Sequence, residues 1–403
     1  MNYQRKTFSV TLICAALLLA APASLTAQSQ SGPPAERKHA ILTRYIDPQA
    51  GMSADDLVVY ALAHNLELLA AHKEIDAAQA MVRQARLRAN PMLDLEGTRQ
   101  ITGKDNTLMA TAKLPLELGG RRPARIAVAE REVDVRVSEV ANRERLLATE
   151  VRQKFGEALA QSLKLSFADQ LVESNLRTFD LVVARVTEGA TAPLEQNMVL
   201  VEVNRLRSQR ETAEGQLEVL MLELRNLMGM PGDETLRLRG DFSGLTEPMI
   251  SESEATVRGL NERADLRGFR AMEDLAEALI EQARSEGRLD ASVSAGYQRM
   301  NSSFPVFGVN DQGQLQPVQS VFNFFKFGVS LDLPVRNKNQ GAIEAAVYGA
   351  EAATQKREFA QLTVRREIAA AFAQYFRNAR AMEIYRVGVL DQARVNLDVV
   401  RQT

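Results

Sequence analysis

Side chains suited to catalysis or metal binding are few in this chain. It has three histidines, His39, His64 and His72, and a single cysteine, Cys14. His64 and His72 lie eight residues apart on one predicted helix, a spacing that does not bring two imidazoles to the same tetrahedral metal ion. The methionines are scattered, and the sequence shows neither a glycine-rich phosphate loop nor a nucleophile elbow. We therefore expect no enzyme, no cofactor and no metal site.

The first 27 residues have the features of a secretory signal peptide. A basic start is followed by an apolar core, which ends in small residues that include a candidate cleavage site at Ala27. The apolar core is shorter than the ~20 residues that a membrane anchor needs. Cys14 lies in this core, so the exported chain should contain no disulfide. Residues 28–52 are interpreted as an N-terminal linker.

Charge and hydropathy exclude several classes of protein. Lys and Arg number 49 and Asp and Glu number 51, a formal net charge of −2 that does not favour nucleic-acid binding. After the signal peptide, no apolar stretch approaches the ~20 residues of a transmembrane helix. The sequence thus predicts an exported protein without a transmembrane helix.

An internal tandem duplication organises the mature chain. Residues 67–86 align without a gap to 265–284 at an offset of 198, and both segments contain Gln-Ala-Arg. Farther along, the two copies align at an offset of 217. We interpret 53–247 as the first repeat and 248–403 as the second.

Two long helices are the main elements that this repeat predicts. Proline is absent from 124–192 and from 335–403, and apolar residues recur there at spacings of three and four. About 60 helical residues would reach about 90 Å, far beyond a compact domain. Each repeat should open with another helix, at 53–89 and 253–287.

Four short strands are expected between these helices. The alternating segments are 92–98, 108–116, 291–299 and 322–333, and 300–320 should form a long exposed hairpin loop. Strands of about ten residues suit the tilted wall of a membrane-spanning barrel. Four strands cannot close a barrel, so this interpretation requires several protomers. A small soluble sheet that caps a helical bundle is the alternative.

The two repeats differ at their ends. The first continues through a tip at 187–193 into a returning helix at 194–228, whereas the second stops before its own tip. We expect that roughly 40 residues of the first repeat have no counterpart in the second.

Four segments carry a family resemblance. They are Ala89-Asn90-Pro91, the run Leu116-Glu117-Leu118-Gly119-Gly120-Arg121-Arg122, the tip 188–195, and Leu333-Pro334-Val335-Arg336-Asn337-Lys338-Asn339-Gln340-Gly341. Because these segments occur in this order within an internal duplication, the chain resembles the TolC-like outer-membrane efflux proteins. It resembles their cobalt-zinc-cadmium resistance subgroup more closely.

The resemblance implies a mainly α fold with a small β part, which a homotrimer completes. Four strands from each protomer would form one transmembrane β-barrel in outer-membrane lipid, and the long helices would form a periplasmic α-barrel. The assembly would be a passive exit duct for heavy-metal cations, joined by a periplasmic adaptor to a proton-driven inner-membrane pump. The alternative function is a soluble periplasmic adaptor or coiled-coil scaffold, although adaptors carry one helical hairpin and not a duplicated helix-strand-strand-helix unit.

The resemblance also implies roles for individual residues. Arg185, Gly189 and Leu194 match the helix-turn-helix tip that would face the adaptor, and Gly189 should take a positive φ there. The strand-to-helix turns are assigned to Gly119, Gly120 and Gly341. These six are the candidate site residues of the sequence.

Overall fold

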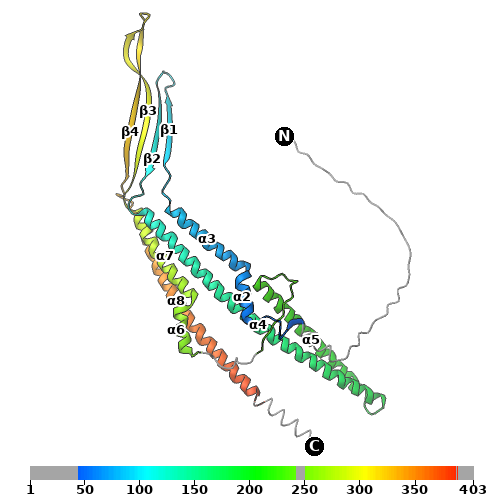
Figure 1. Ribbon diagram of the computed structural model, residues 1–403. Coiled ribbons are helices and arrows are strands. Elements are labelled where there is room, and N and C mark those ends of the chain that lie inside the picture. The colour runs from blue at the N-terminus through cyan, green and yellow to red at the C-terminus, as the bar shows by residue number, and fades with distance from the viewer. Residues whose placement is uncertain (1–43, 242–249, 387, 389–403) are drawn as a thin grey trace, which may run out of the picture.

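The computed structural model describes residues 44–241, 250–386 and 388. The expected signal peptide, with Cys14 and His39, lies outside these residues, as does most of 387–403. The described chain is elongated, with a slender sheet at one end, a body of long helices, and a helical hairpin that projects at the other end (Figure 1). The fold is therefore mainly helical with one small antiparallel sheet, as expected.

The same order of elements occurs twice. The first pass contains α2 (Ala54–His64), α3 (Leu66–Arg86), β1 (Met92–Arg99), β2 (Asn106–Pro115), α4 (Arg121–Thr187) and α5 (Pro193–Met228). The second contains α6 (Glu252–Glu262), α7 (Ala264–Glu286), β3 (Asp290–Val309), β4 (Leu315–Asp332) and α8 (Gln340–Ile384). Helix pair, strand pair and long helix recur in both, which is the order that a duplication requires.

The expectation of single opening helices at 53–89 and 253–287 is wrong, because each is broken. The breaks fall at Asn65 and Arg263, 198 residues apart, where ψ is 118° and 132°. The Asn65 side chain accepts a hydrogen bond from the backbone N–H of Leu68 at 2.9 Å and donates one to the backbone oxygen of Leu227 at 2.9 Å. Arg263 instead forms an ion pair with Asp265. The matching position of the two breaks agrees with the duplication.

The four strands form one antiparallel sheet in the order β1-β2-β3-β4. The expected loop at 300–320 is wrong: most of it extends β3 and β4 into a ribbon that projects beyond β1 and β2 (Figure 1). The ribbon turns at Asn310, whose side chain accepts hydrogen bonds from the backbone N–H groups of Gln312 and Gln314. Gly313 takes the left-handed conformation there, with φ +74°. Cross-strand hydrogen bonds therefore satisfy backbone groups that an irregular loop would leave to water.

The helices of the body lie side by side. The 67-residue helix α4 packs against α3 and α7, while α8 packs against the other side of α7 (Figure 1). Farther from the sheet, α5 returns along α4 and contacts α2. Since α4 contacts α2, α3, α5 and α7, it joins helices of both repeats.

The main hydrophobic core lies where α2, α4 and α5 meet. Leu57, Val151, Leu217 and Leu224 are fully buried there. The second repeat has a much smaller cluster, and α8 contributes only Ala360 and Val364 to buried surface among its described residues. The other side of α8 exposes Tyr348, Phe359, Leu362 and Phe376. Such an exposed apolar surface is typical of a chain that packs against further copies or partners.

Candidate functional site

One face of the sheet is apolar across all four strands. Side chains of directly paired residues lie on the same face, so the register defines its members. They are Leu93, Leu95, Leu108, Ala110, Ala112, Leu114, Val293, Ala295, Tyr297, Phe325, Phe327, Val329 and Leu331. Several of these side chains are highly exposed to solvent: Phe327 is 84% exposed and Phe325 is 78% exposed. The face ends, away from the helices, at a row that contains Arg299 and Asn323.

The opposite face of the sheet is mostly polar. Its members are Asp94, Glu96, Thr98, Thr107, Thr111, Lys113, Ser292, Ser294, Gln298, Lys326 and Ser330, together with Met92, Met109, Met300, Phe322 and Phe324. Four of these side chains carry charge, whereas the apolar face carries none until the row of Arg299. The sheet can therefore separate an apolar environment from an aqueous one.

Neither face nor edge of this sheet is covered within the described chain. Strands contact only other strands, so no described helix packs on the sheet. The outer edges of β1 and β4 have no neighbouring strand among these residues. Unpaired edges present backbone N–H and C=O groups that readily pair with a strand of another chain.

None of the described helices combines the length and the apolar character needed to cross a bilayer.

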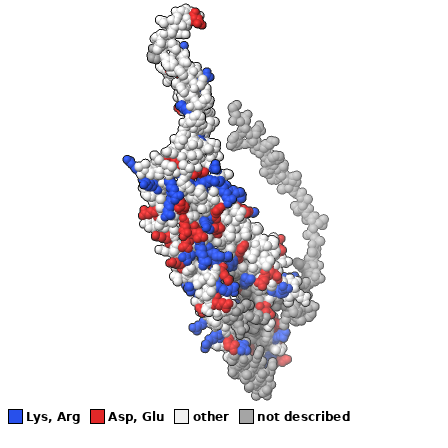
Figure 2. Space-filling model, turned by 60° about the vertical axis from the view of Figure 1, so that its left-hand side comes forward, with Lys and Arg blue, Asp and Glu red and all other residues white. Residues whose placement is uncertain are grey.

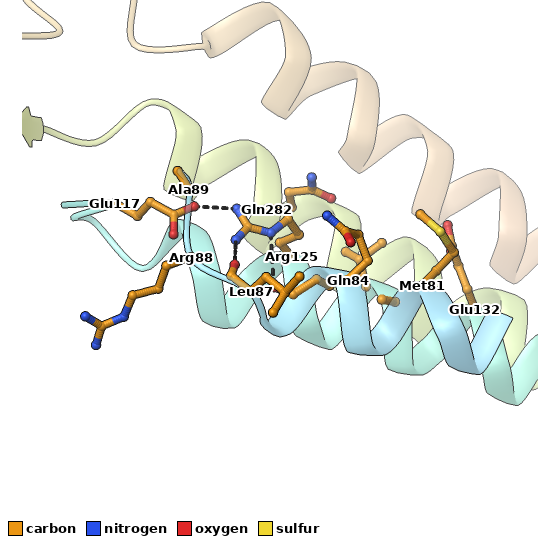
Figure 3. A pocket seen from close by; sticks show the side chains of 12 residues that line it. Met81, Gln84, Leu87, Arg88, Ala89, Glu117, Arg125, Glu132 and Gln282 are labelled. Atoms are coloured by element: carbon orange, nitrogen blue, oxygen red, sulfur yellow. Dashed lines mark hydrogen bonds and ion pairs between the residues drawn. The ribbon is translucent and has the colours of Figure 1, made fainter. Parts of the chain in front are cut away.

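Ion pairs stabilise the junction between the helical body and the end of the sheet nearest to it, which we call the foot of the sheet. The Arg125 guanidinium lies 2.6 Å from the Glu117 carboxylate and donates hydrogen bonds to the backbone oxygens of Ala85 and Leu87 (Figure 3). Arg121 pairs with Asp290 at 3.0 Å and so connects the two repeats. Glu117 and Arg121 belong to the run 116–122 that carries the family resemblance, but the sequence did not predict their ion pairs. Glu117 and Arg125 lie on either side of a turn, and Arg121 and Asp290 lie in different repeats, so no periodic pattern indicates that they meet.

The hydrogen bond from Arg125 lowers the pKa of the Glu117 carboxyl below its ordinary value of 4.5. A depressed pKa in the folded state means that this carboxylate stabilises the protein above about pH 4.5, and that the contribution is lost as the pH falls through the lower, folded pKa. We expect Glu117→Gln to reduce the free energy of unfolding by about 1 kcal/mol at pH 7.

Melting of the helices, followed by circular dichroism, would test this expectation. The difference between wild type and Glu117→Gln should be equal at pH 7 and pH 5.5 and should shrink below pH 4.5. Glu117 and Glu132 both line a pocket of about 440 Å³ beside Arg125 (Figure 3). Glu132→Gln is a matched control, because Glu132 forms no ion pair with a residue that the structure describes. A difference that is independent of pH would contradict the assigned role of the charge.

Two of the three glycines assigned to strand-to-helix turns lie in such a turn. Gly119 and Gly120, between β2 and α4, have φ values of +71° and +83°. The assignment of Gly341 to a strand-to-helix turn is wrong, since it lies inside the first turn of α8. Asn339 takes the left-handed conformation instead, with φ +61°, and its side chain donates a hydrogen bond to the backbone oxygen of Ala283. This contact holds Asn339 in a conformation that glycine would otherwise be expected to supply.

Gly119 also has no room for a side chain. A Cβ atom there would lie 2.7 Å from the Arg288 Cβ, whereas at Gly120 the nearest atom would be the Arg288 Nη1 at 3.4 Å. Both alanine variants would strain a left-handed residue by about 1 kcal/mol. We expect Gly119→Ala to lower the melting temperature clearly more than Gly120→Ala. Equal melting temperatures would contradict the close packing of this turn against Arg288.

The tip between α4 and α5 contains the other three candidate residues. Gly189 has φ +70° with no atom near a would-be Cβ, so its requirement is conformational. The backbone oxygen of Arg185 accepts a hydrogen bond from the N–H of Ala190 and closes the turn. Leu194 is 68% exposed on the first turn of α5. The structure brings all three to one end of the molecule, opposite the sheet (Figure 1).

The histidines that the structure describes do not form a metal site. His64 stacks on Tyr60, and its Nδ1 lies 2.9 Å from the Tyr60 backbone oxygen. His72 lies 3.5 Å from the Glu144 carboxylate. Within the described ranges, no group of three or more His, Cys, Asp or Glu side chains is placed to hold a metal ion.

Comparison with known proteins gives consistent matches. Residues 57–230 match the family model of the outer membrane efflux protein. The chain is 26% identical over 295 residues to the cobalt-zinc-cadmium resistance protein CzcC of Cupriavidus metallidurans. That alignment covers 73% of this chain and 65% of CzcC, so the chain spans just under two thirds of this relative's length.

Solved structures share the fold over most of the chain. A membrane protein from Pseudomonas aeruginosa aligns with a TM-score of 0.67 at 19% identity, over 89% of this chain and 81% of its own. The outer-membrane channel OprN aligns with a TM-score of 0.66 at 17% identity, over 90% and 85%. The outer membrane protein VceC from Vibrio cholerae aligns with a TM-score of 0.63 at 17% identity, over 87% and 85%. At these identities the likeness establishes the arrangement of strands and helices.

Proposed function

Because the chain belongs to the outer membrane efflux protein family, we propose that it is the outer-membrane exit duct of a tripartite efflux pump. The family consists of outer-membrane channels with a periplasmic helical extension, and it is not a family of enzymes. The membership also favours the duct over the adaptor or scaffold that the sequence left open. The two repeats, 53–247 and 248–403, would each supply one strand pair and one set of helices to the duct.

The observation that carries the proposal is the two-faced sheet with open edges. The apolar face extends along β3 from Ala291 to the row of Arg299, roughly 26 Å at about 3.3 Å per residue. Strands of outer-membrane barrels are tilted by about 35–45°, so this length would span roughly 20 Å of height, which is of the same order as the apolar band of about 25 Å in such barrels. In a homotrimer, the edge of β4 would pair with β1 of the next protomer, and the wall would close with its polar face inward.

The tip is proposed to dock a periplasmic adaptor, which would join the duct to a proton-driven inner-membrane pump. Its residues Arg185, Gly189 and Leu194 stand at the end farthest from the sheet, where a second component would approach. The apolar side chains of Leu181, Leu194, Met198 and Val201 are all more than 60% exposed there. A hairpin with such a surface can pack against another helical hairpin.

Heavy-metal cations are the proposed substrate. The support is the name of the relative CzcC, a cobalt-zinc-cadmium resistance protein. A duct need not bind its substrate, and the polar face of the sheet, whose charged residues are Asp94, Glu96, Lys113 and Lys326, would line a passage for hydrated ions. Expression in a strain that lacks its own outer-membrane component for metal export should restore growth in zinc, cobalt or cadmium. Restored growth in organic toxicants alone would contradict the metal assignment.

Fractionation of cells that express the chain with its signal peptide tests the duct itself. We expect the protein in the outer membrane and, on unheated gel electrophoresis, a band of trimer size that heating converts to monomer. An adaptor would extract as a soluble or inner-membrane protein. A soluble monomer would overturn the proposed function.

A further inference from the structure

A positively charged collar surrounds the foot of the sheet. We define the collar as residues 86–91, 116–122, 284–290 and 332–340, the segments that join strands to helices. It contains eight Lys or Arg and four Asp or Glu side chains, a net charge of +4. Because the whole chain carries −2, the remainder carries −6. Figure 2 shows Lys and Arg at the end of the helical body nearest the sheet, while the sheet itself carries only scattered charged side chains.

Half of the collar's cations have no carboxylate partner. Arg88, Arg122, Arg336 and Lys338 form no ion pair with any residue that the structure describes, and all except Arg122 are exposed. Arg122 donates to the backbone oxygen of Arg86, and its charge also helps to lower the pKa of the nearby Glu117 carboxyl. In Figure 3 the Arg88 side chain points away from the Glu117–Arg125 pair. Arg88, Arg336 and Lys338 are therefore available to an external anion.

Exposed apolar side chains border these cations. Leu87 and Leu333 are each 59% exposed, and Val335 is 75% exposed. Leu333 follows Leu331, the last member of the apolar face on β4. The surface thus changes from apolar to basic within a few residues of the sheet. Long basic side chains next to an apolar band are typical of the water–lipid boundary, where their stems lie along the acyl chains and their charges reach the headgroups.

A hollow of about 510 Å³ lies within the collar at the end of β4. Arg121, Arg288 and Arg336 line it, together with the carboxylates of Glu286 and Asp332. The Nε of Arg121 is buried there without a hydrogen-bond partner in the described part of the chain. The hollow is large enough for a headgroup phosphate, and arginine is well suited to bind phosphate oxygens.

We propose that the collar binds the headgroups of anionic phospholipids in the membrane leaflet at the foot of the sheet. This inference rests on the proposed function, because it requires the apolar face to lie in a bilayer. If it does, the headgroup phosphates of that leaflet lie level with the collar. Unpaired cations then favour a headgroup with net negative charge over a zwitterionic one, whose own cation offsets its phosphate. The collar would fix the height of the duct in the membrane.

Fluorescence quenching by brominated lipids can test the collar, because the chain contains no tryptophan. Val335→Trp places one reporter in the collar, and Phe327→Trp places another in the middle of the apolar face. Each full-length protein is reconstituted into phosphatidylcholine vesicles that contain brominated phosphatidylglycerol or brominated phosphatidylcholine. Relative binding constants of the two lipids follow from the quenching.

We expect the reporter of the Val335→Trp variant to show a roughly fivefold preference for phosphatidylglycerol, and the reporter of the Phe327→Trp variant to show none. The preference should disappear when Arg88→Gln, Arg336→Gln and Lys338→Gln are combined. It should also weaken in 0.5 M salt, because the electrostatic screening length is then only about 4 Å. Equal binding of both lipids at the collar, or a preference that survives the triple substitution, would overturn the proposal. Absence of quenching at both positions would mean that the sheet is not in lipid, and would overturn the proposed function as well.

Discussion

Replacing Phe327 by arginine is expected to prevent accumulation of the protein in the outer membrane. Phe327 is 84% exposed on the apolar face, in a row with Ala295, Ala112 and Leu93. An arginine that faces the middle of a bilayer costs about 2–4 kcal/mol, and a trimer would carry three of them. The unheated gel should therefore lose the trimer band, and the cell should degrade the unassembled chain.

Phe324→Arg is the matched control. Phe324 lies on the same strand, three residues away, but on the polar face beside Gln298 and in a row with Met109 and Glu96. An arginine there would point into water in the proposed duct, so the trimer should form at close to the wild-type level. If both variants assemble equally well, or if only Phe324→Arg fails, the assignment of the two faces is wrong.

Leu217→Ala is expected to cause the largest loss of stability in the helical body. Leu217 is completely buried in the core that α5 forms with α2 and α4, beside Met221 and Leu224. Truncation of a buried leucine costs about 2–5 kcal/mol, because transfer energy is lost and a cavity remains. The temperature at which the helical circular dichroism signal disappears should fall by several degrees.

Leu222→Ala, on the same helix, separates burial from helix propensity. Leu222 is 51% exposed, so its truncation should change the free energy of unfolding by no more than about 0.5 kcal/mol. Alanine and leucine have similar helix propensities, so the helix itself is little affected. Equal losses in the two variants would show that the core of the body is not where the structure places it.

The large elements of the fold could be predicted because their signals are local or periodic. The proline-free window at 124–192 contains most of α4, and the two copies of the repeat predicted four strands. The breaks at Asn65 and Arg263 could not be predicted, since Asn65 depends on the backbone oxygen of Leu227, far away in sequence. A helix broken by a distant contact retains its apolar periodicity on both sides.

Two other errors have different causes. The segment 300–320 is rich in polar residues and resembles a loop, but Asn310 and Gly313 supply a tight turn, and that local signal could have identified the ribbon. The assignment of Gly341 failed because Asn339 adopts the left-handed conformation through a contact with α7. The two faces of the sheet could be located only once the register was known, because a shift of one residue exchanges them.

Disulfide trapping between β1 and β4 tests most directly whether three copies close one wall. Leu95→Cys is combined in turn with Phe325→Cys, Phe327→Cys and Val329→Cys, and the only native cysteine, Cys14, lies in the expected signal peptide. Within one sheet, β1 and β4 are separated by β2 and β3, so these positions stand about 14 Å apart, beyond the ~7 Å limit of a disulfide. Bonds can therefore form only between protomers. We expect a covalent trimer, on a non-reducing gel after heating, for at least one pair. Monomers for all three pairs under oxidising conditions would contradict the closure of one wall by three copies.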